Sequence, residues 1–111
     1  MSIIITSHSI KRAKQRCGIK KNSVEQQAER AYNEGLNRID CVGNLRKWLD
    51  YISDQEGKHS THDNNVNKFM IYGSYVWLFD NNVLVTVIDI PSHLMNSANA
   101  QRKRKEGGII T

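Results

Sequence analysis

Apolar residues follow helical spacing in three successive stretches of the first half of the chain. Within each stretch they recur three or four residues apart, as they do on the buried face of an amphipathic helix. In chain order they are Ile10, Ala13 and Cys17; Val24, Ala28, Ala31 and Tyr32; and Leu45, Trp48, Leu49 and Ile52. Gly18 and Gly35 are stop signals after the first two stretches. The expected N-caps are Thr6 or Ser7, Asn22 or Ser23, and Asn44. The pattern predicts three helices before residue 57.

The second half of the chain has the pattern of strands. Residues 68–72, 75–79 and 83–90 are rich in β-branched and aromatic side chains, and turn signals separate them at Gly73-Ser74 and Asn81-Asn82. The last run is apolar on both faces and ends at Pro91, so we expect it in a central, covered position. The expected fold class is α+β, with N-terminal helices packed on one face of a C-terminal three-stranded antiparallel meander. Residues 3–5 are expected as a short edge strand or a buried leader.

Two segments lack apolar periodicity. Residues 57–65 are polar and rich in helix breakers, which predicts a loop. His59, His62 and Asp63 in this loop are metal-ligand types, but a further strong ligand would have to come from elsewhere. We therefore expect no metal and no cofactor. Residues 96–111 are basic and polar, and we expect a frayed helix or a flexible tail there, beyond a single domain of residues 1–95.

The length and the cysteines favour a reduced intracellular protein. A chain of 111 residues can bury one core without disulfide bonds. Cys17 and Cys41 are far apart and not in metal-type spacing, so they are expected as packing residues, and Trp48 and Trp77 as core residues. No apolar run approaches the roughly 20 residues that span a bilayer. We expect a cytoplasmic protein with no membrane partner.

Positive charge is concentrated at the two ends of the chain. The net charge is +5, yet residues 25–100 carry more acidic than basic side chains. Such asymmetry favours a polyanionic partner, either a nucleic acid or an acidic protein surface. The candidate nucleic-acid-binding residues are Lys11, Lys14, Lys20, Lys21, Arg102, Lys103, Arg104 and Lys105.

The first helix carries the candidate chemistry. His8, Arg12 and Arg16 are four residues apart and form one stripe along the expected helix. Histidine can transfer a proton near pH 7, and arginine binds phosphate oxygens in a bidentate way. Tyr72 and Tyr75 flank the first hairpin turn and could stack on bases. A solvated basic face with a chance histidine is the alternative interpretation.

The opening ITSHSIKRAKQR and the closing IYGSYVWLFDNNVLVTVIDIP resemble a family of small phage and Gram-positive bacterial proteins over most of residues 3–95. The layout is also similar to the RelE- and BrnT-type ribonuclease toxins, whose N-terminal helices pack on an antiparallel sheet that carries a metal-independent RNA-cleaving site. By this analogy His8 is the general acid or base, and Arg12 and Arg16 clamp the phosphate. A sheet tyrosine, Tyr75 or Tyr72, orients the base or leaving group. The chain departs from that layout in its polar loop and basic tail.

Three functions remain open from the sequence. The first is a metal-independent endoribonuclease that uses the His/Arg helix face. The second is a non-catalytic phage protein that binds RNA or inhibits a nucleic-acid-binding host enzyme, as anti-CRISPR proteins do. The third is a regulatory subunit recognised through its basic helix. No second histidine has an evident place beside His8, which counts against efficient catalysis.

Overall fold

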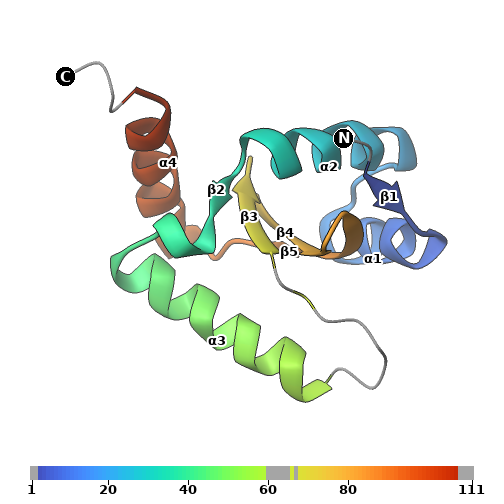
Figure 1. The fold of residues 1–111 in the computed structure, drawn as a ribbon, viewed down its shortest axis with the longest axis horizontal. Coiled ribbons are helices and arrows are strands. Elements are labelled where there is room, and N and C mark those ends of the chain that lie inside the picture. The colour runs from blue at the N-terminus through green and yellow to red at the C-terminus, as the bar shows by residue number, and fades with distance from the viewer. Residues whose placement is uncertain (1–2, 60–65, 67, 108–111) are drawn as a thin grey trace.

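A mixed sheet forms the centre of the computed structural model, which describes residues 3–59, 66 and 68–107 (Figure 1). Its five strands lie in the order β1-β5-β4-β3-β2. They are β1 (Ile4–Ile5), β2 (Leu36–Asn37), β3 (Lys68–Tyr72), β4 (Tyr75–Asp80) and β5 (Val83–Asp89). The helices are α1 (Ser7–Cys17), α2 (Lys21–Glu34), α3 (Gly43–His59) and α4 (Ser92–Gly107), with the 3-10 turn η1 (Arg38–Asp40) before α3.

The predicted meander is confirmed as the middle of this sheet. β3, β4 and β5 are antiparallel neighbours, with Tyr72 opposite Tyr75 and Asp80 opposite Val83. Asn81 has a φ of 55°, the left-handed conformation that asparagine tolerates in a tight turn. The short β1 pairs in parallel with β5, and β2 pairs antiparallel with β3. Of the two alternatives expected for residues 3–5, the edge strand is the one found, at Ile4–Ile5. The strand β2 was not predicted.

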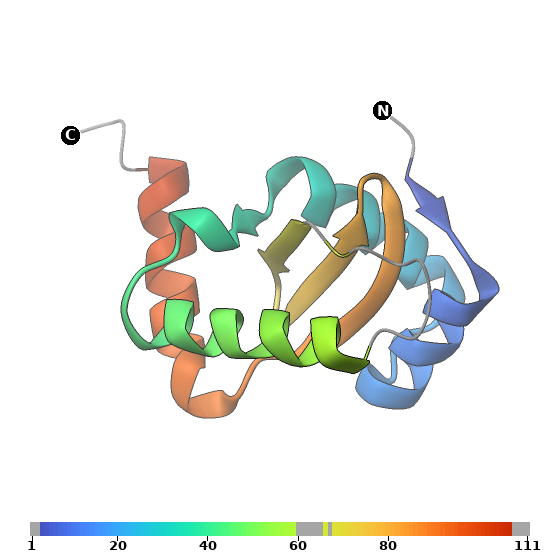
Figure 2. The same cartoon turned by 60° about the horizontal axis from the view of Figure 1, so that its bottom comes forward.

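Helices cover both faces of the sheet, so the prediction of helices on one face is wrong. Alternate residues of β4 point to opposite faces of the sheet and are buried on both. Trp77 and Phe79 pack with the apolar side chains of α1 and α2, whereas Val76 and Leu78 pack with those of α3 and α4. Figure 2 shows α3 in front of the strands and α2 behind them. Because every central strand is apolar on both sides, a single helical layer would leave one of these faces exposed.

The predicted N-cap of α2 is wrong. The helix begins at Lys21, after Lys20 in extended conformation, so Asn22 and Ser23 lie exposed in its first turn. The helix ends before Gly35, as predicted. A Cβ at Gly35 would collide with the Ala31 carbonyl oxygen and lie 3.0 Å from that of Ile71. Glycine thus lets the end of α2 approach β3 closely.

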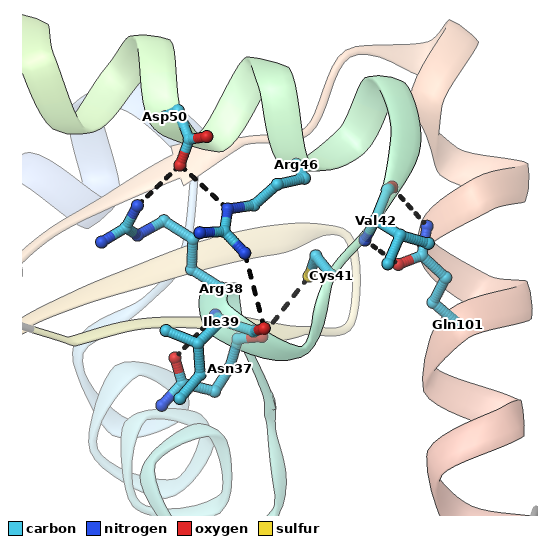
Figure 3. A network of polar contacts seen from close by, with 8 residues as sticks. All are labelled: Asn37, Arg38, Ile39, Cys41, Val42, Arg46, Asp50 and Gln101. Atoms are coloured by element: carbon cyan, nitrogen blue, oxygen red, sulfur yellow. Dashed lines mark hydrogen bonds and ion pairs between the residues drawn. The ribbon is translucent and has the colours of Figure 1, made fainter.

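Of the two alternatives expected for residues 96–111, the helix is the one found, since α4 extends to Gly107, and a flexible tail that begins at residue 96 is wrong. Residues 108–111 lie outside the described part of the chain. Its inward positions, Leu94, Ala98 and Gln101, are buried. Figure 3 shows how Gln101 fixes the helix to the connection before α3. Its side-chain oxygen accepts from the Val42 N–H at 2.9 Å, and its amide nitrogen donates to the Val42 carbonyl at 3.2 Å. The polar residue is therefore buried with its hydrogen bonds made.

A network of charges beside Gln101 joins η1 to α3 (Figure 3). Arg38 and Arg46 both donate to one carboxylate oxygen of Asp50, at 2.6 and 3.0 Å. The hydrogen bonds from Arg46 and then Arg38 lower the pKa of Asp50. These side chains are partly exposed, so the network contributes little to the stability of the fold.

The loop predicted for residues 57–65 is helical at its start, because α3 continues to His59. Residues 60–65 and 67 lie outside the described part of the chain, so the predicted metal ligands His62 and Asp63 do too. Among the described helices, none is long and apolar enough to cross a membrane.

Candidate nucleic-acid interface

Both ends of α1 are fixed by local hydrogen bonds. The Thr6 hydroxyl accepts from the Ser9 N–H at 3.1 Å, and the Ser9 hydroxyl accepts from the Thr6 N–H at 3.1 Å. This reciprocal capping box leaves Ser9 satisfied and fully buried. At the other end, Gly18 adopts a φ of 67° and its N–H donates to the Lys14 carbonyl. The helix therefore holds a fixed orientation on β5.

The buried face of α1 is shifted from the predicted one. Ser9 and Ala13 are buried and Cys17 is half-buried, whereas Ile10 is only half-buried. Hydrophobicity predicted Ile10 on the buried face and not Ser9. It does not record that the capping box satisfies the Ser9 hydroxyl, which is what allows Ser9 to be buried.

The outer surface of α1 is basic, as predicted. Lys11, Lys14 and Arg16 are exposed and Arg12 is half-buried; we call these four residues the α1 basic face. The helix contains no acidic residue, and none of the four makes an ion pair with a described side chain. Lys20 and Lys21 continue the exposed positive surface into the start of α2. Such a surface can bind several phosphates at once.

The four candidate catalytic residues fall into two groups. His8 is exposed and lies one turn from Arg12, within reach of the same phosphate. Arg16 lies about 12 Å further along the helix axis than His8. It is at the C-terminal end of α1, where its neighbour Cys17 lies close to Tyr75. Arg12 lies between His8 and Arg16 on the helix, one turn from each. The catalytic role of these residues and of Tyr75 stays a prediction.

The C-terminal end of α1 brings a thiol, a carboxylate and a phenol together. The Cys17 thiol lies 3.9 Å from the Val87 carbonyl oxygen and hydrogen-bonds Asp89, which is the strand partner of Tyr75. Burial, followed by the charge and hydrogen bond of Asp89, raises the pKa of Cys17 to about 12, although Arg16 acts in the opposite direction. Burial and the neighbouring Cys17 and Asp89 also raise the pKa of Tyr75. Both groups stay protonated at neutral pH, so they can donate hydrogen bonds but are poor bases.

Cys17 should react slowly with alkylating agents despite its partial exposure. Because the thiolate is the nucleophile and the pKa is raised to about 12, the alkylation rate should keep rising with pH beyond 9. Asp89→Asn removes the negative charge and replaces one acceptor oxygen with an NH2 donor, so it should lower the pKa of Cys17 and speed alkylation at pH 8. Iodoacetamide rates followed by mass spectrometry in a Cys41→Ala background measure this. An ordinary thiol titration near pH 8.5 in the native protein would contradict it.

Two tyrosines and two arginines gather at the β3–β4 turn. Tyr72 and Tyr75 are direct strand partners, both half-buried on the α1/α2 face of the sheet. Arg30 of α2 hydrogen-bonds Tyr72, which raises the pKa of Arg30. The guanidinium of Arg102, from α4, lies 5.4 Å from the centre of the Tyr72 ring. No pattern in the sequence indicated Arg30, because the neighbours of this residue depend on how α2 crosses the sheet.

The remaining predicted basic residues lie on α4. Arg102 is half-buried and Lys103 is exposed. Arg104 and Lys105 belong to the same helix, and their side chains lie outside the described part of the chain. The described residues contain no group of three or more His, Cys, Asp or Glu side chains placed to hold a metal ion.

No family model matches the chain, and neither a curated protein nor a solved structure matches it.

Proposed function

We propose that the protein binds nucleic acid, and RNA in particular, through the α1 basic face. The observation that carries this proposal is the pairing of a rigidly anchored helix with four outward cations that have no ion-pair partner among the described residues. Ser9 and Ala13 are fully buried on the packed face of the helix, so the position of its cations is set before a ligand binds. Such preorganisation reduces the entropy lost on binding.

Phosphate is the ligand that best fits this surface. Arg12 and Arg16 are one turn apart and can each bind two phosphate oxygens, while the lysines add charge. A half-buried aromatic ring, Tyr75, lies close to Cys17 at the C-terminal end of the same helix. Cations and a partly exposed ring at one helix suit a nucleic acid better than an acidic protein, because bases stack on aromatic rings and carboxylates do not.

The proposal predicts a loss of salt-dependent binding when the basic face is neutralised. In the double variant Lys11→Gln and Lys14→Gln, the slope of log affinity against log salt should fall by roughly 0.7 for each lost contact to a single strand. Fluorescence anisotropy with labelled RNA over a salt series measures the slope. The matched control is Arg46→Gln with Lys47→Gln on α3, which removes the same charge from the other face of the sheet. Equal slopes in both double variants would contradict the proposal.

RNA cleavage is a second candidate, favoured by the exposed His8 one turn from Arg12. If His8 transfers a proton, His8→Ala should slow cleavage by about 10²-fold or more and leave RNA affinity nearly unchanged. Arg12→Lys should be almost as harmful, because lysine lacks the bidentate fork. The measurement is incubation with end-labelled RNA in EDTA, followed by a search for cyclic-phosphate ends.

Two outcomes separate the alternatives. Absence of cleavage on free RNA and on ribosomes would leave a binding protein. Basic-face variants that still bind RNA but no longer capture a nucleic-acid-binding enzyme would favour the inhibitor function instead.

A further inference from the structure

Aromatic rings and guanidinium groups from separate elements meet where the sheet ends at the β3–β4 turn. Tyr72 and Tyr75 project from adjacent strands on the same face, and Arg30 and Arg102 reach Tyr72 from α2 and α4. We call these four residues the tyrosine platform. They are brought together only by the tertiary fold, since they are spread over residues 30–102 of the sequence.

The buried side chain of Trp77 supports the two tyrosines of the platform. Trp77 is fully buried beneath the turn, and its indole N–H donates to the Tyr72 carbonyl oxygen at 3.2 Å. The Tyr75 and Trp77 rings meet edge to face, with their centres 6.3 Å apart. Because both tyrosines remain partly exposed above this buried tryptophan, their rings can contact a ligand without first being ordered.

Both arginines are already positioned by Tyr72. Arg30 hydrogen-bonds it, and Arg102 lies over its ring with one guanidinium nitrogen 3.5 Å from the Gly73 carbonyl oxygen. Each guanidinium has five N–H donors, so these contacts leave several donors free for phosphate oxygens. The two groups reach Tyr72 from helices on opposite faces of the sheet. A phosphate chain passing the turn would therefore meet a cation from each helix.

The nearby acids limit where phosphates can lie. Asp89 is the strand partner of Tyr75, and Glu34 acts on Arg30 from within α2. A carboxylate beside Tyr75 repels a phosphate there, whereas it can accept hydrogen bonds from the amino groups of a base. The charge pattern thus favours bases over the tyrosines and phosphates around the arginines.

We propose that the tyrosine platform binds unpaired bases, which makes the ligand a single-stranded nucleic acid. The inference rests on the proposed nucleic-acid binding and adds that bases are contacted as well as phosphates. The bases of a duplex are stacked within the helix, and only splayed bases can stack on protein rings. Arg30 and Arg102 then hold the backbone that leads to the stacked base.

Three oligonucleotides of equal length separate base contacts from phosphate contacts. They are oligouridine, the corresponding RNA duplex, and an abasic strand that keeps the phosphates and lacks the bases. Wild-type protein should bind oligouridine about ten-fold or more tightly than the abasic strand, the range expected for stacking of one or two bases. Fluorescence anisotropy at a single salt concentration gives the three affinities, and oligodeoxythymidine tests whether the 2′-hydroxyl matters.

The decisive variant is Tyr72→Leu. It should weaken oligouridine binding about ten-fold and leave abasic-strand binding nearly unchanged, because only the stacking surface is lost. The matched control is Tyr51→Leu, which removes an exposed tyrosine from α3. Tyr72→Phe keeps the ring and should restore most of the lost affinity. If Tyr72→Leu fails to fold, Tyr75→Leu and Arg30→Gln test the same surface, with folding checked by circular dichroism.

The outcomes distinguish this inference from the proposed function. Equal binding of oligouridine and the abasic strand, or unchanged binding in a folded Tyr72→Leu protein, would overturn the platform while the α1 basic face could still bind phosphates. Tighter binding of the duplex than of oligouridine would also overturn it. Failure of every oligonucleotide to bind would refute both proposals.

Discussion

Trp77→Ala is expected to lower the free energy of unfolding by about 3–5 kcal/mol, the range for truncating a buried aromatic side chain. Trp77 is 0% exposed and packs between β4 and the helices α1 and α2. The substitution leaves a cavity and removes the donor to the Tyr72 carbonyl oxygen. Urea denaturation followed by circular dichroism measures the change.

The second tryptophan provides the control. Trp48 lies on α3 and is only half-buried, so Trp48→Ala should destabilise the protein clearly less than Trp77→Ala. Equal losses would mean that the two faces of the sheet do not differ in packing as the structure indicates. Because Trp77 supports Tyr72 and Tyr75, its loss should also weaken oligouridine binding under conditions where the variant is still folded.

The sequence was informative wherever apolar side chains alone decide the structure. The inward positions of α2 and α3, among them Val24, Ala28, Leu45 and Leu49, follow from helical spacing, and all four are fully buried. The hairpin turn at Asn81 followed from local chemistry, because asparagine tolerates positive φ. These features depend on residues that are close in sequence, so a single sequence can reveal them.

Features that depend on polar burial or on distant contacts were missed. Ser9 and Gln101 face inward because backbone groups satisfy their side chains, and hydrophobicity does not record this. β2 has two residues, too few for a periodic signal. The platform arginines Arg30 and Arg102 meet at Tyr72 only because α2 and α4 pack on opposite faces of the sheet.

The same limit applies to the candidate catalytic stripe. His8, Arg12 and Arg16 were correctly placed on one helix, and their order along it follows from sequence spacing. Which end of α1 lies near Tyr75 depends on the direction in which the helix packs on β5. That direction brings Cys17, at the C-terminal end of the helix, to Asp89 and Tyr75. Spacing along the sequence contains no information on this direction.

A chain that ends at Met95 is expected to lose roughly 3 kcal/mol of stability. The truncation removes buried Ala98 and the hydrogen bonds of Gln101 to Val42 and Ser97, each worth about 1 kcal/mol. It also uncovers the apolar cluster against which α4 packs, including Leu36 and Cys41. The melting temperature should fall, and Arg102 and Lys103 are lost with the helix. The salt slope of RNA binding should therefore become shallower in whatever fraction remains folded.

A chain that ends at Lys103 is the matched control, because it keeps Ala98, Gln101 and Arg102 and removes Arg104 and Lys105. It should melt within a degree or two of the full chain. Gln101→Ala, made in the full chain, should lower the free energy of unfolding by about 1–3 kcal/mol, since it leaves the backbone groups of Val42 without partners. If the chain ending at Met95 melted like the full protein, α4 would not be a stabilising part of the fold. The contact of Arg102 with Tyr72 could then not be a fixed part of the platform, since it requires a docked α4.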